Sequence, residues 1–260
     1  MSQDNHYTFG DNDLAAQRLR LLADAFEPST RALLARVGPL GGGRAIDLGC
    51  GPGYTTELVR DVLAPAETIG IDKSARLVAM ARARARGDVQ FVAHDVTALP
   101  FPVPPADVVY VRFLLTHLSA PAAAIAAWSD ALCDGGRLVL EETASMRSPH
   151  AVFQRYYAIV EEMQAHYGQV MYIGNALDAL SAGAGLAIVH ATTAALSLPA
   201  PLMARIHAMN IRTWKSDPFI RTTHDASAID AIEDGLDRVA RGDESAPPVA
   251  CGMRQIVATR

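Results

Sequence analysis

Three aspartates stand at similar places in the first hundred residues, each at the end of a short apolar run. They are Asp47, Asp72 and Asp95, and a loop of sequence Gly-Cys-Gly-Pro-Gly, residues 49–53, comes shortly after the first of them. In an open α/β sheet, ligands bind beyond the carboxyl ends of the strands, where glycine lets the backbone approach a ligand closely. We therefore expect a ligand site built from this loop and the three carboxylates.

The spacing of the glycines and the charge beside them indicate which ligand the loop holds. A dinucleotide fingerprint has the spacing Gly-x-Gly-x-x-Gly, whereas this loop has Gly-x-Gly-x-Gly. Asp47 would repel a phosphate and attract an ammonium or sulfonium group. Asp72 can accept hydrogen bonds from two ribose hydroxyls, and Asp95 can accept one from an exocyclic amine such as that of adenine. Together these preferences describe S-adenosylmethionine and disfavour a nicotinamide-dependent oxidoreductase.

The apolar patterning predicts the elements that would position these residues. Short branched runs are typical of buried parallel strands, and we predict strands over Ala45–Leu48, Thr68–Ile71, Val89–Ala93, Asp107–Val111 and Arg137–Leu140. Helical stretches lie between them, over Thr55–Leu63, Ser74–Arg86 and Pro121–Leu132. This alternation predicts an α/β fold with a doubly wound, Rossmann-like parallel sheet.

The flanking segments are expected to add helices at the N-terminus and a small helical, aromatic cover after Glu142. One helix is predicted from Asp13, and Pro28 is expected to separate it from a second over Thr30–Val37. The further elements expected are helices over Pro149–Tyr167, Asn175–Ala182, Pro201–Arg212 and Ala226–Arg241, and strands over Leu186–Ala191 and Gln255–Ala258, the last being antiparallel. The predicted division is an N-terminal lid (1–40), a cofactor-binding core (41–145), a cover that binds the acceptor (146–175 and 199–250), and segments that complete the core sheet (176–198 and 251–260).

Four segments in this order resemble the class I S-adenosylmethionine-dependent methyltransferases of small molecules. They are DLGCGPG, then GID at 70–72, HDV at 94–96 and VRFLLTHL at 111–118, and the likeness covers roughly residues 7–142. The front end is similar to a bacterial subgroup with a Tyr-x-x-Gly segment and an Arg-Leu pair, here Tyr7, Gly10, Arg18 and Leu19. The resemblance implies that Arg18 meets the cofactor carboxylate. The full set of cofactor-binding residues expected is Tyr7, Arg18, Asp47, Gly49, Cys50, Gly51, Asp72, Lys73, Asp95, Val96, Arg112 and His117.

Fewer residues are candidates for catalysis than for cofactor binding. His117 follows the fourth strand, and its ordinary pKa suits proton abstraction near neutral pH. Glu142, just past the fifth strand, could orient or deprotonate an acceptor. Either residue could instead be structural. Candidate acceptor-binding residues in the cover are Tyr156, His166, Tyr172 and Trp214.

The composition indicates which classes of partner and which cellular compartment to expect. With 23 basic and 28 acidic residues the net charge is −5, which disfavours a nucleic-acid substrate. The cysteines Cys50, Cys133 and Cys251 are far apart and match no metal or disulfide pattern, so a reducing cytoplasm is expected and no metal is predicted. Neither a membrane span nor a signal peptide is expected. The chain could form a homodimer.

Because the methyl group of this cofactor is already electrophilic, the protein must mainly align the reactants and exclude water. We therefore expect methyl transfer to an oxygen, nitrogen or carbon atom of a small, aromatic or apolar molecule. The alternatives are a cofactor-binding enzyme of the same fold that catalyses elimination, isomerisation or cyclisation without methyl transfer, and a module that only binds the cofactor.

Overall fold

A computed structural model describes residues 13–260, so the predicted contacts of Tyr7 and Gly10 lie outside the described residues. The strands are β1 (Arg44–Leu48), β2 (Glu67–Asp72), β3 (Val89–Ala93), β4 (Ala106–Arg112), β5 (Leu132–Arg147), β6 (Ala187–Leu198) and β7 (Val249–Thr259). The α-helices are α1 (Asp13–Val37), α2 (Tyr54–Leu63), α3 (Ala75–Arg84), α4 (Pro121–Asp130), α5 (Ala151–His166), α6 (Leu177–Gly183), α7 (Ala200–Trp214), α8 (Pro218–Thr223) and α9 (Ala226–Arg241). Two short 3₁₀ turns, Leu115–His117 and Ile173–Ala176, complete the set in this part of the chain.

The strands form one sheet in the order β3-β2-β1-β4-β5-β7-β6. The pairings from β3 to β5 are parallel, and β7 runs antiparallel to both β5 and β6. The order reverses at β1, where Ile46 pairs with Ile69 on one side and with Val109 on the other. The doubly wound sheet with an antiparallel last strand, predicted from the alternation of strands and helices, is confirmed.

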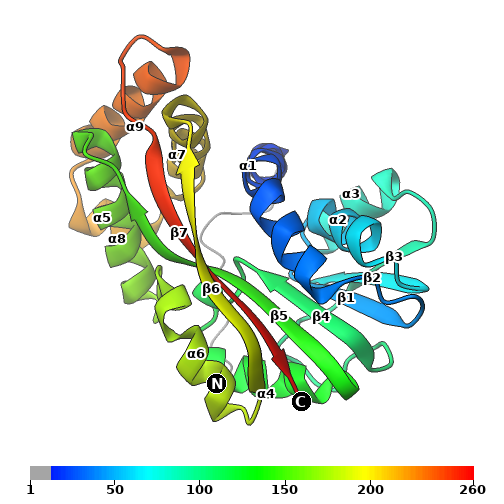
Figure 1. Ribbon diagram of the computed structural model, residues 1–260. Coiled ribbons are helices and arrows are strands. Elements are labelled where there is room, and N and C mark those ends of the chain that lie inside the picture. The colour runs from blue at the N-terminus through cyan, green and yellow to red at the C-terminus, as the bar shows by residue number, and fades with distance from the viewer. Residues whose placement is uncertain (1–12) are drawn as a thin grey trace.

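Successive side chains of the central strands face opposite layers, because a strand has a period of two. Val108 and Tyr110 belong to a core cluster with α1 and α2, whereas Val109 and Val111 belong to one with α4 and α6. Both faces of the sheet are therefore covered by helices, as Figure 1 shows. This double burial explains why these strands read as unbroken apolar runs rather than as alternating patterns.

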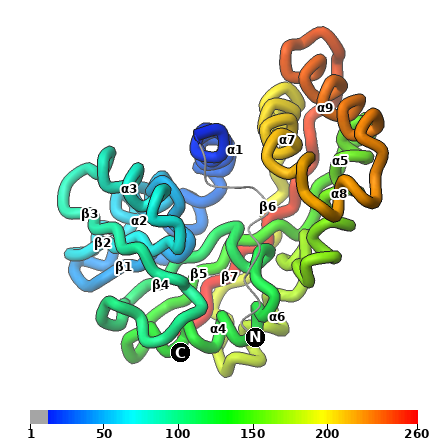
Figure 2. The backbone as a smooth tube through the Cα atoms, turned by 180° about the vertical axis from the view of Figure 1, so that it is seen from behind, coloured from blue at the N-terminus to red at the C-terminus, as the bar shows by residue number. Residues whose placement is uncertain are grey.

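The strands β5, β6 and β7 extend well beyond the runs predicted for them. Their pairing continues as far as Arg147 opposite Ala250 and Leu198 opposite Val249. The ends were missed because exposed and half-buried residues alternate along β6, so that no continuous apolar run marks it. In Figures 1 and 2 these three strands leave the core and continue between the helices α5, α7 and α9.

The prediction of two N-terminal helices is wrong, since α1 is a single helix with Pro28 inside it. Proline lacks the N–H that would bond to the carbonyl four residues earlier. Phe26 before it and Leu33 and Leu34 after it are all buried, and this packing holds both halves on one axis. The buried Glu141 of β5 adds to this, because its carboxylate accepts a hydrogen bond of 2.6 Å from the Thr30 hydroxyl of α1.

The helices α5, α7 and α9 pack around a second core that includes Phe153, Trp214 and Leu236. The short helix α8 was not predicted; it begins at Pro218, with the Asp217 carboxylate accepting from the Phe219 amide. Within residues 13–260, no helix is both long and apolar enough to cross a membrane.

Candidate active site

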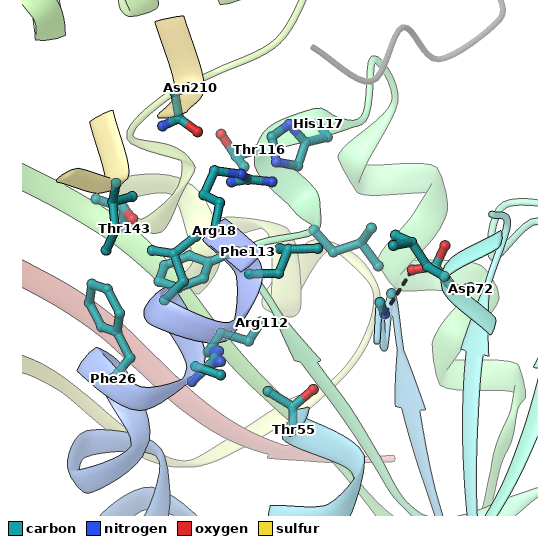
Figure 3. A pocket seen from close by; sticks show the side chains of 18 of the residues that line it. Arg18, Phe26, Thr55, Asp72, Arg112, Phe113, Thr116, His117, Thr143 and Asn210 are labelled. Atoms are coloured by element: carbon teal, nitrogen blue, oxygen red, sulfur yellow. Dashed lines mark hydrogen bonds between the residues drawn. The ribbon is translucent and has the colours of Figure 1, made fainter. Parts of the chain in front are cut away.

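A cavity of about 650 Å³ opens at the carboxyl ends of the central strands. Its wall is built from α1, the loop at 49–53, the ends of β2 and β3, the segment 112–118, and one face each of α5 and α7. Figure 3 shows Arg18, Phe26, Phe113, Thr116, His117 and Asn210 converging on this space from different elements. The volume lies within the range typical of small-molecule sites.

Two glycines of the loop are required by the conformation and the packing there. Gly49 has φ +71°, and a Cβ on it would lie 3.0 Å from the Leu114 side chain. Gly53 has φ +84°, and its Cβ would lie 2.6 Å from the Phe91 ring. L-residues with side chains rarely adopt such φ values, and the close contacts exclude a side chain in addition. The loop is therefore held open toward the cavity with its backbone exposed to a ligand.

Asp72 lies beside this loop and is fixed in place by two backbone amides. Its Oδ2 accepts from the Gly51 N–H at 2.9 Å, and its Oδ1 accepts from the Ser74 N–H at 2.8 Å. Ser74 is the N-cap of α3, because its hydroxyl accepts from the Leu77 amide. A carboxylate oxygen has two acceptor positions, and Asp72 lines the cavity. Its carboxylate can therefore accept hydrogen bonds from ligand hydroxyls in the cavity.

The other loop-side candidates are also brought together. Gly49, Cys50, Gly51, Lys73, Asp95 and Val96 all line the cavity. Burial alone would raise the pKa of Asp95, but hydrogen bonds from Thr97 hold it below its ordinary value. Burial raises the pKa of the Cys50 thiol well above its usual range, so this cysteine stays protonated.

Asp47 is not among the residues that line the cavity, in contrast to its predicted contact with a cationic ligand. Its Oδ2 accepts from the Thr55 hydroxyl at 2.6 Å and from the Thr56 hydroxyl at 2.7 Å, which ties the end of β1 to the first turn of α2. Burial raises the pKa of Asp47 to about 6 despite these bonds. Asp47 thus supports the loop from beneath.

The two arginines predicted to face the cofactor both line the cavity. Arg18 is 3% exposed, and Figure 3 shows its guanidinium directed toward Thr116 and His117. Arg112 donates from Nη1 to the Thr30 hydroxyl at 2.9 Å. One end of the cavity is therefore positively charged at Arg18, while the loop end carries Asp72 and Asp95.

His117 lines the cavity as predicted, but its electrostatics differ from the expectation. Burial, together with the positive charges of Arg18 and Lys73, lowers the pKa of His117 to about 3. The ring is therefore neutral and a weak base at pH 7. The assumption of an ordinary pKa was wrong, because the local sequence indicates neither the full burial of this ring nor the two nearby cations.

Glu142 was a candidate for orienting or deprotonating an acceptor, with a structural role as the alternative, and the structure places it outside the cavity lining. It is fully buried outside the cavity wall, and its Oε1 accepts from the Leu114 and Leu115 amides, both at 2.7 Å. These bonds hold the start of the segment 113–118, in which Phe113 has the unusual φ of +53° for a non-glycine residue. The Phe113 ring packs edge to face on Phe26 in the cavity, with centroids 5.0 Å apart. Glu142 thus fixes a strained part of the wall.

Tyr156 is the one acceptor candidate of the four that belongs to the described lining of the cavity. His166 points outward and stacks on Phe219, with centroids 4.2 Å apart. Trp214 lies behind Tyr156, with centroids 6.3 Å apart, and Tyr172 is half-buried outside the lining. The structure thus places these three candidates outside the lining, since the helical face of each segment could not be oriented from its aromatic content.

Several lining residues were not identified as site residues from the sequence. They are Phe26, Phe113, Thr116, Thr143, Gln164, Met203, Ile206, His207 and Asn210, among others. The spacing of Met203, His207 and Asn210 along α7 would have placed them on one helical face. Which face meets the cavity depends on the long strands that set the position of α7.

The fold and the site together define a class of protein. A parallel sheet with an antiparallel last strand, a glycine loop at the reversal of strand order, and carboxylates beyond β2 and β3 are the features of the class I methyltransferases that the sequence resembles. Residues 46–140 match the family model described as a methyltransferase domain. Over these residues the chain is similar to a methyltransferase domain, in line with its resemblance to the class I S-adenosylmethionine-dependent enzymes.

Relatives with known names share this part of the chain. It is 34% identical to the trans-aconitate 2-methyltransferase of Methylobacterium nodulans over 142 residues, which are 54% of this chain and 54% of that protein. It is 32% identical to the demethylmenaquinone methyltransferase of Renibacterium salmoninarum over 112 residues, which are 43% and 46% of the two chains. The chain spans about half the length of these relatives.

Solved structures share the fold over a longer stretch. A Bacillus halodurans protein assigned as a methyltransferase matches with TM-score 0.61 and 16% identity, covering 89% of this chain and 98% of that one. The [4+2]-cyclase SpnF matches with TM-score 0.57 and 21% identity, covering 91% and 81%. The phosphoethanolamine N-methyltransferase 2 of Haemonchus contortus, solved with S-adenosyl-L-methionine, matches with TM-score 0.54 and 16% identity, covering 90% and 52%.

The residues present fit S-adenosylmethionine. Gly49 and Leu114 both line the cavity, and a Cβ at Gly49 would lie 3.0 Å from the Leu114 side chain, so the lining has no room for a side chain there. Asp72 and Asp95 supply the acceptors that hydroxyls and an amine need, and the volume leaves room for a second small molecule.

Proposed function

We propose that this chain is a methyltransferase that moves a methyl group from S-adenosylmethionine to an oxygen, nitrogen or carbon atom of a small aromatic or apolar molecule. One observation carries the proposal: a single cavity joins the glycine loop with its carboxylates to an aromatic and apolar wall on α5 and α7. A donor bound at the loop and an acceptor bound at that wall would share one enclosed space.

The chain's own residues would bind and orient the reactants. Asp72 and Asp95 would hold the hydroxyl and amine groups of the cofactor, and the backbone at 49–51 would lie along its amino-acid part. When bound, the cofactor supplies an electrophilic methyl group. Tyr156, Phe113 and Phe26 would pack against the acceptor and exclude water, which strengthens electrostatic interactions in the site.

Proton handling in this proposal does not rely on Glu142. Methyl transfer to a hydroxyl needs a proton acceptor or an acceptor that arrives ionised. The neutral His117 ring can accept a hydrogen bond from the reacting group, and the Arg18 charge favours an ionised oxygen nearby.

The first test is calorimetric titration of the full chain with S-adenosylmethionine, S-adenosylhomocysteine and NAD. We expect the adenosyl ligands to bind at micromolar concentration or below and NAD not to bind. Asp72→Ala should weaken adenosyl binding by about 100-fold, because two hydrogen bonds to a fixed carboxylate are lost. Asp88→Ala, at an exposed carboxylate in the turn before β3, is the matched control and should bind normally. Binding of NAD instead would contradict the proposal.

A second candidate is a reaction without methyl transfer, such as cyclisation, because a cyclase is among the proteins that share the fold. The two candidates differ in the fate of the cofactor. Methyl transfer forms one S-adenosylhomocysteine per product, so mass spectrometry of turnover mixtures from an acceptor panel decides between them.

We place the enzyme in the cytoplasm, in keeping with three cysteines that form no disulfide. The proposed partner is the small acceptor, and nucleic acid is not proposed as a substrate at a net charge of −5. A homodimer stays a prediction, which sedimentation velocity would check.

A further inference from the structure

We propose that the acceptor is an uncharged aromatic or apolar compound with a hydrogen-bond-donating hydroxyl, and that the amide oxygen of Asn210 or of Gln164 accepts the hydrogen bond from this hydroxyl. The inference rests on the proposed function and deepens it, because it assigns the chemistry of the acceptor half of the cavity.

The acceptor half is formed by one face of α5 and one face of α7. Tyr156, Val160 and Gln164 are four residues apart along α5 and therefore lie on one side of it. The lining residues of α7 are Met203, Ile206, His207 and Asn210. Most of this surface is apolar or aromatic, so the few polar atoms in it decide what a ligand must offer.

Two amide oxygens in this wall have no hydrogen-bond partner among the described residues. They are Gln164 Oε1 and Asn210 Oδ1, on side chains whose residues are 2% and 6% exposed. The other end of the Asn210 amide is occupied, since its Nδ2 donates to the Tyr156 hydroxyl at 2.7 Å. Figure 3 shows the Asn210 amide at the cavity, on the side opposite the loop. A buried carbonyl without a donor is costly, and a donor on a bound molecule removes that cost.

His207 adds a third polar group to the same wall. Its Nε2 lies 3.1 Å from the Tyr157 hydroxyl, and its ring stacks on Tyr156 with centroids 4.2 Å apart. Its Nδ1 is buried with no partner among the described residues. Burial lowers the pKa of His207 to about 3, so the ring is neutral.

The charges around the cavity exclude ionic acceptors from this half. The lining residues of α5 and α7 include no Asp, Glu, Lys or Arg. An ammonium group would find no carboxylate there and would face Arg18. A tricarboxylate would need several cations close by, and the three lining cations, Arg18, Lys73 and Arg112, all lie outside α5 and α7. The wall therefore suits an uncharged molecule that donates a hydrogen bond.

The test uses a pair of probes that differ in donor ability and little in size, 2-naphthol and 2-fluoronaphthalene. Each is titrated into the full chain saturated with S-adenosylhomocysteine. We expect 2-naphthol to bind about tenfold more tightly or better, because only the hydroxyl satisfies a buried carbonyl. Asn210→Leu and Gln164→Met keep the side-chain size and remove the carbonyl, so in at least one of them the preference should fall below about threefold.

A matched control keeps the result interpretable. Gln154→Met makes the same substitution on the exposed face of α5 and should keep the full preference. Unchanged S-adenosylhomocysteine affinity in each variant shows that it is folded. Equal affinity of the wild type for both probes, no binding of 2-naphthol, or an unchanged preference in both variants would overturn the inference. Failure to bind S-adenosylhomocysteine at all would instead overturn the proposed function.

Discussion

At the scale of single residues, the most informative departure is Glu142. Its position just past the predicted fifth strand suggested a group for chemistry, yet the structure places it within β5, and its Oε1 accepts from two backbone amides of the segment 113–118. Burial raises the pKa of Glu142 to about 8, and the nearby Glu141 charge acts in the same direction. A carboxyl in this state carries a proton at neutral pH and still accepts through Oε1.

This buried carboxyl predicts a pH dependence of stability. The ordinary pKa of a glutamate is 4.5 and the folded value is about 8. Between these two pH values the folded chain holds a proton that the unfolded chain releases, so the free energy of unfolding falls as pH rises, by about 1.4 kcal/mol per pH unit. Glu142→Gln keeps the accepting oxygen and does not titrate. Urea unfolding at pH 5, 6, 7 and 8 measures the free energy of unfolding of both proteins. The value for the variant relative to that for the wild type should increase at each step in pH. The same pH dependence in both proteins would contradict the raised pKa.

At the scale of elements, the turn Ile173–Ala176 packs closely against the backbone of β5. A Cβ on Gly174 would lie 2.7 Å from the Thr143 carbonyl oxygen and 2.8 Å from that of Glu142. These are backbone atoms of a strand and cannot turn aside, unlike a flexible side chain. The close approach positions Thr143, which lines the cavity, next to the acceptor half.

Gly174→Ala is therefore expected to destabilise the chain, by about 2 kcal/mol as in other overpacked sites. Gly183→Ala is the matched control, since a Cβ at that position in α6 meets nothing within 4 Å. The control should be neutral or slightly stabilising, because alanine favours helix more than glycine does. Chemical denaturation of both variants measures the difference, and equal stabilities would show that the β5 backbone yields easily.

At the scale of the whole molecule, the cavity joins parts of the chain that are far apart in sequence. Its lining includes Arg18, Leu19, Leu22, Ala23 and Phe26 of α1 as well as the loop at 49–53. We expect saturating S-adenosylhomocysteine to slow amide exchange in residues 13–26 and 113–118, and to leave the outer face of α9 unchanged. Hydrogen exchange with mass spectrometry checks this, with Asp72→Ala as the control that should show little protection. Protection restricted to the glycine loop would mean that α1 takes no part in binding.

The sequence was most informative where local chemistry and position coincide. The order of strands and helices, the glycine loop and Asp72 could all be predicted, because doubly buried strands and tight loops leave strong local signals. The acceptor half could not, because Asn210 and His207 reach the cavity only through the course of β5, β6 and β7 beyond the core. The low pKa of His117 arises mainly from its burial and in addition from the charge of Arg18, which is about a hundred residues away in the chain. Interactions between such distant residues have no local signature.

Leu198 of β6 pairs with Val249 of β7. The segment between them, 199–248, therefore begins and ends at opposed positions on neighbouring strands. That segment contains α7, α8 and α9, and hence half of the wall that would select the acceptor. An insertion whose ends already meet can be exchanged for another that covers the same core, which includes Val249 and Met253 of β7. Such an exchange would change the wall proposed to select the acceptor and leave the glycine loop, Asp72 and Asp95 in the chain.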